Sequence, residues 1–273
     1  MRKKIVFRWV KVFLLVYCIV GIAWYYGQDH LLLRPAPMDA KEAYSFTQPF
    51  TELNLRYDAA TRLNIVQFPA TDRPADSLAK GVILYFHGNG YNIAHFGAHA
   101  GDITSKGYEL WIMDYPGFGK STGGRTEKEL YAYSLVFYKL ARSRWKPSQI
   151  VLYGRSFGTG LAAQLASVRD CRRLILESPY YSMTSVFRRY LFLYPVSTML
   201  HYHLPTNEYL PAVTAPITIF HGDADGTIPY SNSVRLKSLL KPGDEYITIP
   251  GAGHGDLHDF PLFNQKLDSV LNL

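Results

Sequence analysis

Cysteine and charge are both scarce in this sequence of 273 residues. The two cysteines are Cys18 and Cys171. The first lies in an apolar N-terminal stretch, which argues against an intramolecular disulfide and leaves the redox compartment open. Charged residues make up 19% of the chain and hydrophobic residues 48%, so the composition excludes a disordered protein and supplies a sizeable core. The sequence also lacks internal repeats and low-complexity segments, and its length suits one large α/β domain or two small ones.

Beyond the N-terminus the chain also lacks an excess of basic over acidic residues, although its formal net charge is +7. Five basic residues and no acidic residue fall within the first eleven positions, namely Arg2, Lys3, Lys4, Arg8 and Lys11. The other 24 basic residues nearly balance the 22 acidic residues. The basic character therefore belongs to the N-terminus, and we predict no nucleic-acid partner.

Long uncharged apolar runs are absent except at the N-terminus. Residues 12–26 carry no charge, and counting from Ile5 gives an apolar segment of 22 residues that contains Arg8 and Lys11. A membrane-spanning helix needs about 20 residues, and basic side chains near its end can reach the lipid headgroups. The aromatic cluster at residues 24–26 stands where an interfacial aromatic belt is expected.

We therefore predict a signal-anchor helix over residues 1–27. A cleaved signal peptide is disfavoured because no Ala-x-Ala-like site follows the apolar run. A lipoprotein signal ending at Cys18 is disfavoured by the bulky Tyr17 before it, and a soluble core helix by the basic cluster. The positive-inside rule places the N-terminus in the cytoplasm and the rest of the chain across the membrane, in a periplasm, a lumen or the exterior. Residues 28–49 contain Arg-Pro-Ala-Pro and no periodicity, which predicts a linker.

The pattern from residue 50 onward predicts one α/β domain over residues 50–273. Two short strand-like runs predict an antiparallel hairpin, and the polar residues 69–80 predict a loop. After residue 81, short apolar runs alternate with helix-length stretches, which is typical of a doubly wound, mostly parallel sheet. The predicted strands are 50–57, 63–68, 82–86, 110–113, 150–153, 174–176, 217–220 and 246–249. The predicted helices are 93–106, 127–144, 156–167, 232–240 and 258–271.

Residues 179–212 interrupt this alternation. They are rich in aromatic residues and proline, and we predict a small helical cap inserted after a strand. An aromatic cap over the strand ends is suited to lining an apolar substrate pocket. Tyr180 and Tyr181 are therefore candidate pocket residues, together with Tyr91 from the loop after the first parallel strand. The alternative for each aromatic residue is that it only packs the cap onto the domain.

The motif with the strongest chemical signal is Gly154-Arg155-Ser156-Phe157-Gly158. An apolar strand pattern precedes it and a small-residue helix pattern follows it, which is the context of a nucleophile elbow. The two glycines avoid collisions in so tight a turn. A chance match in a glycine-rich loop is the alternative, and the strand–turn–helix context argues against it. We predict Ser156 as a nucleophile and the N–H group of Phe157 as an oxyanion donor.

A serine nucleophile needs a base that a third group holds in place. His254 follows the last predicted strand and Asp225 follows the strand before it, so the chain order is the Ser–Asp–His order of α/β hydrolases. All three residues come just after the carboxyl ends of predicted parallel strands, where open sheets place their sites. We predict these three as a catalytic triad, with Asp223 as the reserve acid and Glu177 as a weaker candidate.

A second oxyanion donor is expected in the loop after the first parallel strand, which reads His87-Gly88-Asn89-Gly90. The N–H group of Asn89 is the first choice and that of Gly90 the second. A direct role for His87 and a purely supporting one remain open.

Two other patterns suggest different chemistry at first sight. His95 and His99 are spaced i, i+4, but the glutamate of a zinc-protease motif is missing between them, so we predict no metal site. Residues 114–121 are rich in glycine and end in Lys-Ser, but they lack the spacing of a phosphate-binding loop. Nucleotide binding is therefore not predicted.

Together these motifs resemble the membrane-anchored α/β-hydrolase-domain serine hydrolases, a group with serine-aminopeptidase-like bacterial members and depalmitoylase-like eukaryotic ones. The segments that carry the resemblance are residues 87–90, 114–121, 154–158, 177–179, 221–225 and 253–254. The resemblance covers roughly residues 28–270. It implies an α/β-hydrolase fold, hydrolysis of an acyl ester, thioester or amide, and no cofactor, and it favours Asp225 over Asp223 as the acid.

We expect a membrane-anchored serine hydrolase that cleaves acyl ester or thioester bonds through an acyl-enzyme intermediate. The anchor and the aromatic cap favour lipid-like acyl substrates. An aminopeptidase-like amide hydrolase is the alternative within the same class. A non-catalytic, membrane-tethered binding module is the alternative from another class, and the complete triad argues against it.

Overall fold

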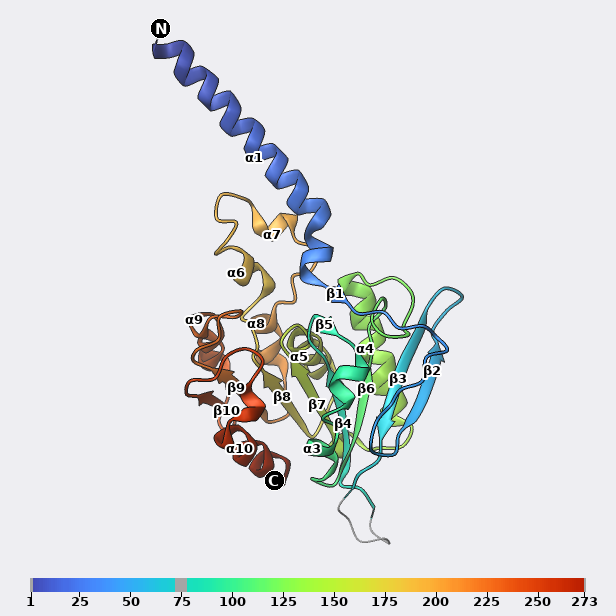
Figure 1. The fold of residues 1–273 in the computed structure, drawn as a ribbon. Coiled ribbons are helices and arrows are strands. Elements are labelled where there is room, and N and C mark those ends of the chain that lie inside the picture. The colour runs from blue at the N-terminus through green and yellow to red at the C-terminus, as the bar shows by residue number, and fades with distance from the viewer. Residues whose placement is uncertain (1, 72–77, 273) are drawn as a thin grey trace.

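A mixed eight-stranded sheet forms the centre of this computed structural model, which describes residues 2–71 and 78–272. Its strands are β2 (Thr51–Arg56), β3 (Arg62–Phe68), β4 (Gly81–Phe86), β6 (Tyr108–Met113), β7 (Ile150–Arg155), β8 (Arg173–Glu177), β9 (Ile217–Gly222) and β10 (Glu245–Ile249). Their order is β10-β9-β8-β7-β4-β6-β3-β2 (Figure 1). All neighbours from β10 to β6 run parallel, whereas β3 pairs antiparallel with both β6 and β2.

This arrangement confirms the predicted doubly wound, mostly parallel sheet and the antiparallel hairpin before it. Each strand begins and ends within two residues of its predicted range. Every residue of β4 and of β9 is buried, because helices cover both faces of the sheet, and this explains why the strands read as continuous apolar runs.

Helices pack on the two faces of the sheet in two groups, each with its own apolar core. The helices α4 (Glu127–Arg142) and α5 (Gly158–Val168) share one core with the cap, whereas α2 (Ile93–Gly97), α3 (Gly101–Thr104) and α10 (Pro261–Asn272) share the other. The domain also contains the short helix α9 (Tyr230–Ser233) and 3-10 turns at Pro147–Gln149, Val234–Leu239 and Leu257–Asp259.

Three predicted helices differ from those observed. The prediction of one helix over 93–106 is wrong, because α2 ends at Gly97 and α3 begins at Gly101, and glycine is a poor helix former. The predicted helix over 232–240 is mostly a 3-10 turn. The last helix starts at Pro261 rather than at residue 258, because proline favours the first position of a helix.

The predicted cap lies between β8 and β9. It consists of the short helices α6 (Met183–Phe187), α7 (Val196–Met199) and α8 (Thr206–Tyr209), followed by a 3-10 turn at Leu210–Ala212. It packs into the same core as α4 and α5.

The N-terminal helix α1 (Arg2–Leu32) projects away from the domain (Figure 1). It is long and apolar enough to cross a membrane by length and composition, a test that a signal sequence also passes. The helix runs five residues into the range predicted as a linker, since no proline interrupts it before Pro35. The chain then forms β1 (Arg34–Pro35), which pairs with β5 (Gly90–Tyr91). In the loop predicted over 69–80, residues 72–77 lie outside the described residues.

Candidate active site

Ser156 stands on a strained turn between β7 and α5. Its φ angle is +50°, a left-handed conformation that costs free energy for any residue other than glycine. A Cβ atom on Gly154 would lie 2.6 Å from the carbonyl oxygen of Gly158, and one on Gly158 would lie 2.0 Å from the carbonyl oxygen of Phe86. Close backbone contacts therefore require both glycines, and this local geometry is that of a nucleophile elbow.

Ser156, His254 and Asp225 lie in one hydrogen-bonded row. His254 Nε2 is 2.8 Å from Ser156 Oγ, and His254 Nδ1 is 2.8 Å from Asp225 Oδ2. The other carboxylate oxygen of Asp225 accepts the N–H groups of Thr227 and Ile228, each at 2.8 Å. Because the carboxylate can only accept, Nδ1 carries the proton of the neutral imidazole and Nε2 is free to accept the serine proton.

The two reserve acids lie elsewhere. The Asp223 carboxylate is exposed and accepts the N–H group of Gly251, at the start of the loop that carries His254. Glu177 is buried beneath the elbow in an ion pair with Arg155. Of the three acids considered from the sequence, Asp225 is the one in contact with the histidine.

The loop after β4 lies beside the elbow. A Cβ atom on Gly88 would be 3.7 Å from Ser156 Cβ. The Asn89 side-chain amide donates to the Leu32 carbonyl, and the backbone carbonyl of Asn89 accepts the N–H group of Arg34. Asn89 therefore also holds the chain that leaves α1. Within residues 2–71 and 78–272, the N–H group of Phe157 has no backbone acceptor. The oxyanion roles of Phe157, Asn89 and Gly90 remain predictions.

His87 supports this loop from within the domain. It is fully buried, its Nδ1 is 2.7 Å from the Gly88 carbonyl and its Nε2 is 3.3 Å from Asp114 Oδ1. Asp114 in turn accepts the N–H group of Ile93. Gly119 has a φ angle of +46° and leaves no room for a Cβ atom beside the Asp114 carboxylate. The glycine-rich segment 114–121 thus closes over a buried carboxylate, which favours the supporting role for His87.

The three candidate pocket residues lie in different environments. Tyr180 is fully buried, and its hydroxyl donates to the Phe157 carbonyl at 3.0 Å, so it braces the elbow and does not line an open pocket. Tyr181 is half-buried beneath the guanidinium of Arg235. Tyr91 is 62% exposed and stacks on His95. Only Tyr91 and Tyr181 are therefore accessible to a ligand.

Sequence reasoning left Arg155 without a role, although it links the elbow to the histidine loop. Its Nη2 donates to the Gly255 carbonyl at 2.9 Å, and its Nε is 3.0 Å from Glu177 Oε1. The other Glu177 oxygen accepts from the Tyr153 hydroxyl at 2.6 Å and lies 3.1 Å from His258 Nε2. Burial raises the pKa of Glu177, but Arg155 and His258 outweigh that effect and bring the pKa to about 2. The sequence does place a charged residue at the end of each of two predicted strands, Arg155 and Glu177. This pattern predicts an ion pair only when β7 and β8 are known to be neighbours in the sheet.

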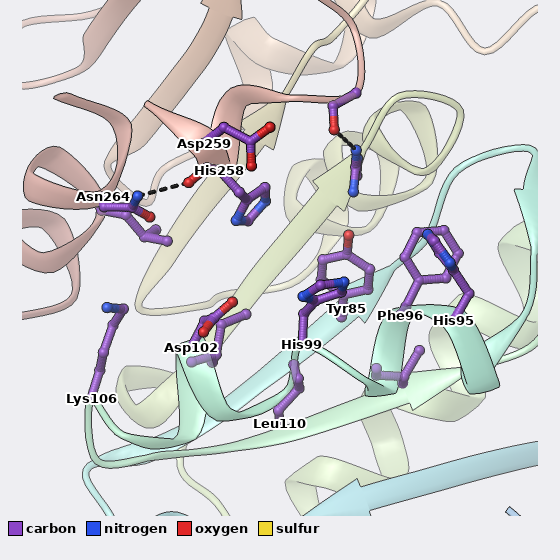
Figure 2. Close-up of a pocket in the computed structure, with 15 residues that line it drawn as sticks. Tyr85, His95, Phe96, His99, Asp102, Lys106, Leu110, His258, Asp259 and Asn264 are labelled. Atoms are coloured by element: carbon purple, nitrogen blue, oxygen red, sulfur yellow. Dashed lines mark hydrogen bonds between the residues drawn. The ribbon is translucent and has the colours of Figure 1, made fainter. Parts of the chain in front are cut away.

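A cavity of about 230 Å³ lies on the face of the sheet covered by α2, α3 and α10 (Figure 2). Arg155 and Gly255, the neighbours of Ser156 and His254, form part of its wall. Polar side chains face one another across it in Figure 2, namely His95, His99, Asp102 and Lys106 on one side and His258, Asp259 and Asn264 on the other. The three tyrosines predicted from the sequence do not line this cavity. The rings of His95 and His99 are 6.4 Å apart.

Several known proteins are similar to this chain in sequence. A sequence model of the family "Serine aminopeptidase, S33" matches residues 77–209. The α/β hydrolase domain-containing protein aho-3 of Caenorhabditis elegans is 30% identical over 197 residues, which is 70% of this chain and 57% of that protein. The α/β hydrolase domain-containing protein 17B of Homo sapiens is 29% identical over 197 residues, 71% of this chain and 67% of that protein. The chain thus spans about three fifths of the length of the first curated relatives it matches.

Solved structures share the fold at low sequence identity. An esterase of Pyrococcus furiosus has a TM-score of 0.66 and 14% identity, over 87% of this chain and 96% of that one. Est1E of Butyrivibrio proteoclasticus, solved with ferulic acid bound, has a TM-score of 0.62 and 18% identity, over 80% of this chain and 96% of that one. This chain has the α/β-hydrolase fold, and its sequence is similar to the serine-aminopeptidase family and to α/β hydrolase domain-containing proteins.

Proposed function

We propose that this chain is a serine hydrolase that cleaves acyl ester or thioester bonds with Ser156, His254 and Asp225. The observation that carries the proposal is the pair of 2.8 Å contacts that join the serine to the histidine and the histidine to a buried carboxylate. A hydroxyl so placed can lose its proton to the imidazole as it attacks a carbonyl, and the carboxylate stabilises the imidazolium that forms.

The reaction follows from these contacts. Ser156 Oγ bonds to the acyl carbon while His254 Nε2 takes the hydroxyl proton. The N–H groups of Phe157 and Asn89 receive the negative oxygen, and one such donor is worth about 3 kcal/mol of transition-state stabilisation. His254 then gives the proton to the departing alcohol or thiol. Water, activated by the same imidazole, releases the acid from the acyl-enzyme and restores the serine.

The preference for lipid-like acyl groups is supported by the apolar α1 helix and by the aromatic cap. We propose that α1 is a signal anchor with its N-terminus in the cytoplasm and the hydrolase domain on the opposite side of the membrane. Five basic residues within the first eleven positions, at the end of the helix far from the hydrolase domain, support this orientation. Protease treatment of sealed membrane vesicles with their cytoplasmic face outward tests it, because a C-terminal tag must then be protected until detergent opens the vesicles. Digestion of the tag in sealed vesicles would refute the orientation.

Labelling with a fluorophosphonate probe tests the catalytic proposal. Membranes that carry the wild-type chain should give a labelled band, and Ser156→Ala should remove it while the amount of folded protein stays the same. Equal labelling of the two proteins would refute the role of Ser156. Absence of label on folded wild-type protein would instead favour a binding module.

The bond that is cleaved is tested with purified wild-type protein. Acyl p-nitrophenyl esters and acyl thioesters of rising chain length are compared with aminoacyl amides. The proposal expects turnover of the esters or thioesters to exceed that of the amides. Faster amide cleavage would make the chain a peptidase.

A further inference from the structure

The cap ends in an exposed apolar segment. Residues 190–194 read Tyr-Leu-Phe-Leu-Tyr and are here called the cap tip. Tyr190 is 61% exposed, Phe192 74% and Leu193 56%. Isolated apolar side chains are common on protein surfaces, but three large ones within four positions require an explanation. In Figure 1 the loop between α6 and α7, which carries the cap tip, lies on the side of the domain from which α1 projects.

The cap tip is bound directly to α1. The rings of Tyr194 and Tyr17 are stacked, with centroids 4.4 Å apart and planes 4° from parallel. The Tyr194 hydroxyl donates to the Tyr17 carbonyl at 2.8 Å, and the Tyr17 hydroxyl donates to the Leu193 carbonyl at 2.9 Å. A Cβ atom at Gly21 would lie 2.9 Å from the Tyr194 ring, so the glycine makes room for this contact.

Further contacts hold the cap along the same helix toward the domain. Trp24 packs on Phe187 with ring centroids 4.9 Å apart. Gln28 is 1% exposed; its amide donates to the Met199 carbonyl and accepts the N–H group of His201, both at 2.8 Å. The cap tip is therefore fixed at the level of Tyr17 on α1, and the two elements are coupled at several points.

Tyr17, where the cap tip contacts α1, lies within the apolar part of the helix. Tyr17 is seven residues from Trp24 toward the N-terminus, a distance of about 10 Å at 1.5 Å per residue. If the aromatic cluster at residues 24–26 marks the interface next to the domain, lipid that surrounds α1 at Tyr17 must also surround the cap tip. A depth of about 10 Å is within the range reached by interfacial elements.

The local chemistry suits such a position. The N–H groups of Tyr190 and Leu191 both donate to the Phe187 carbonyl, and that of Tyr194 donates to the Leu191 carbonyl. Backbone groups bonded within the loop lower the cost of entering lipid. The exposed pair at residues 188–189, both arginine, directly precedes the cap tip, where basic side chains can meet anionic headgroups.

We propose that the cap tip inserts into the bilayer beside α1, so that lipid acyl chains cover Tyr190, Phe192 and Leu193. The cap is then a second membrane-contacting element. This inference rests on the membrane anchoring of α1 proposed above and does not depend on the catalytic role of Ser156.

Depth-dependent fluorescence quenching tests the inference in the full-length chain. Both natural cysteines are replaced by serine, and an environment-sensitive dye is attached to a single cysteine in Phe192→Cys, in Leu15→Cys on the exposed face of α1, or in Ser148→Cys on the exposed 3-10 turn before β7. The proteins are placed in vesicles of phosphatidylcholine and phosphatidylglycerol that contain lipids spin-labelled in the acyl chain. The inference expects strong quenching at positions 192 and 15 and little at 148.

The outcomes separate the two proposals. Strong quenching at position 15 together with little quenching at position 192, as at position 148, would overturn the insertion of the cap tip. The membrane anchoring of α1 would then remain supported. Little quenching at 15 overturns the anchor and the insertion together, whereas labelling of Ser156 by the fluorophosphonate is unaffected. If position 192 is shielded from aqueous iodide but not quenched by the spin-labelled lipids, another protein surface covers the cap tip and the inference is wrong.

A charge variant gives a second reading. With the dye at Tyr190→Cys, Phe192→Asp should cut lipid quenching severalfold, and the matched control Phe192→Leu should retain it. Because position 192 is mostly exposed, neither change disturbs the core. Equal quenching in the two variants would overturn the inference.

Discussion

Arg155 offers a sharp test of how the site is held together. Its guanidinium is 20% exposed and pairs with the Glu177 carboxylate, which is fully buried. Replacing Arg155 by leucine removes the cation and leaves the anion in the protein interior. It also removes the hydrogen bond to the Gly255 carbonyl, next to His254. The variant therefore disturbs both stability and the position of the catalytic base.

The expected magnitudes follow from that geometry. Removing one partner of a buried ion pair lowers the free energy of unfolding by about 3 kcal/mol or more. For a domain of this size, such a loss lowers Tm by roughly 6–12 °C. A displacement of the catalytic base by about 1 Å lowers the rate on the order of a hundredfold. We expect kcat to fall between ten- and a hundredfold with little change in KM, because Arg155 positions groups and contacts no substrate in this scheme.

A double-mutant cycle with Glu177→Gln measures the pair itself. The neutral amide removes the uncompensated charge, so Arg155→Leu should cost at least about 1 kcal/mol less in the Glu177→Gln background. Thermal unfolding and ester hydrolysis are measured for all four proteins. Arg169→Leu, at an exposed arginine, is the matched control and should change neither quantity. Additive effects of the two substitutions would refute the assignment of a coupled buried pair.

Three more predictions follow from the site. Asp225→Asn should lower turnover on the order of ten-thousandfold, while Asp223→Asn changes it little; similar losses in both would refute the choice of acid. Burial lowers the pKa of His258, but the charge of the buried Glu177 and its hydrogen bond outweigh that effect and raise the pKa. The stability that the protonated histidine contributes is therefore present below about pH 6.5 and is lost as pH rises through the folded-state pKa. The difference in unfolding free energy between wild type and His258→Gln, measured by urea titration, should narrow as pH rises over that range, and a constant difference would contradict this. Gly158→Ala should abolish soluble folded protein because its Cβ meets a carbonyl at 2.0 Å, whereas Gly90→Ala, with open space around it, should fold as judged by circular dichroism.

Local physics explains what the sequence alone could predict about this protein. Glycines at positions 154 and 158, an apolar run before them and small residues after them define the elbow within eleven residues, since the steric conflict they avoid is a contact between near neighbours in the chain. Strand alternation likewise follows from short apolar runs buried on both faces. The order of Ser156, Asp225 and His254, each just after a strand, was enough to nominate the triad.

Only the tertiary structure decided how distant segments meet. Arg155 and Glu177 are paired because β7 and β8 are neighbours in register, which no local pattern specifies. Tyr180 is buried against the Phe157 carbonyl, and the cavity lies between α2–α3 and the segment after β10. The contact of α1 with the cap tip joins residues more than 170 positions apart. Such contacts depend on how the whole chain packs, and local sequence patterns carry no information about that packing.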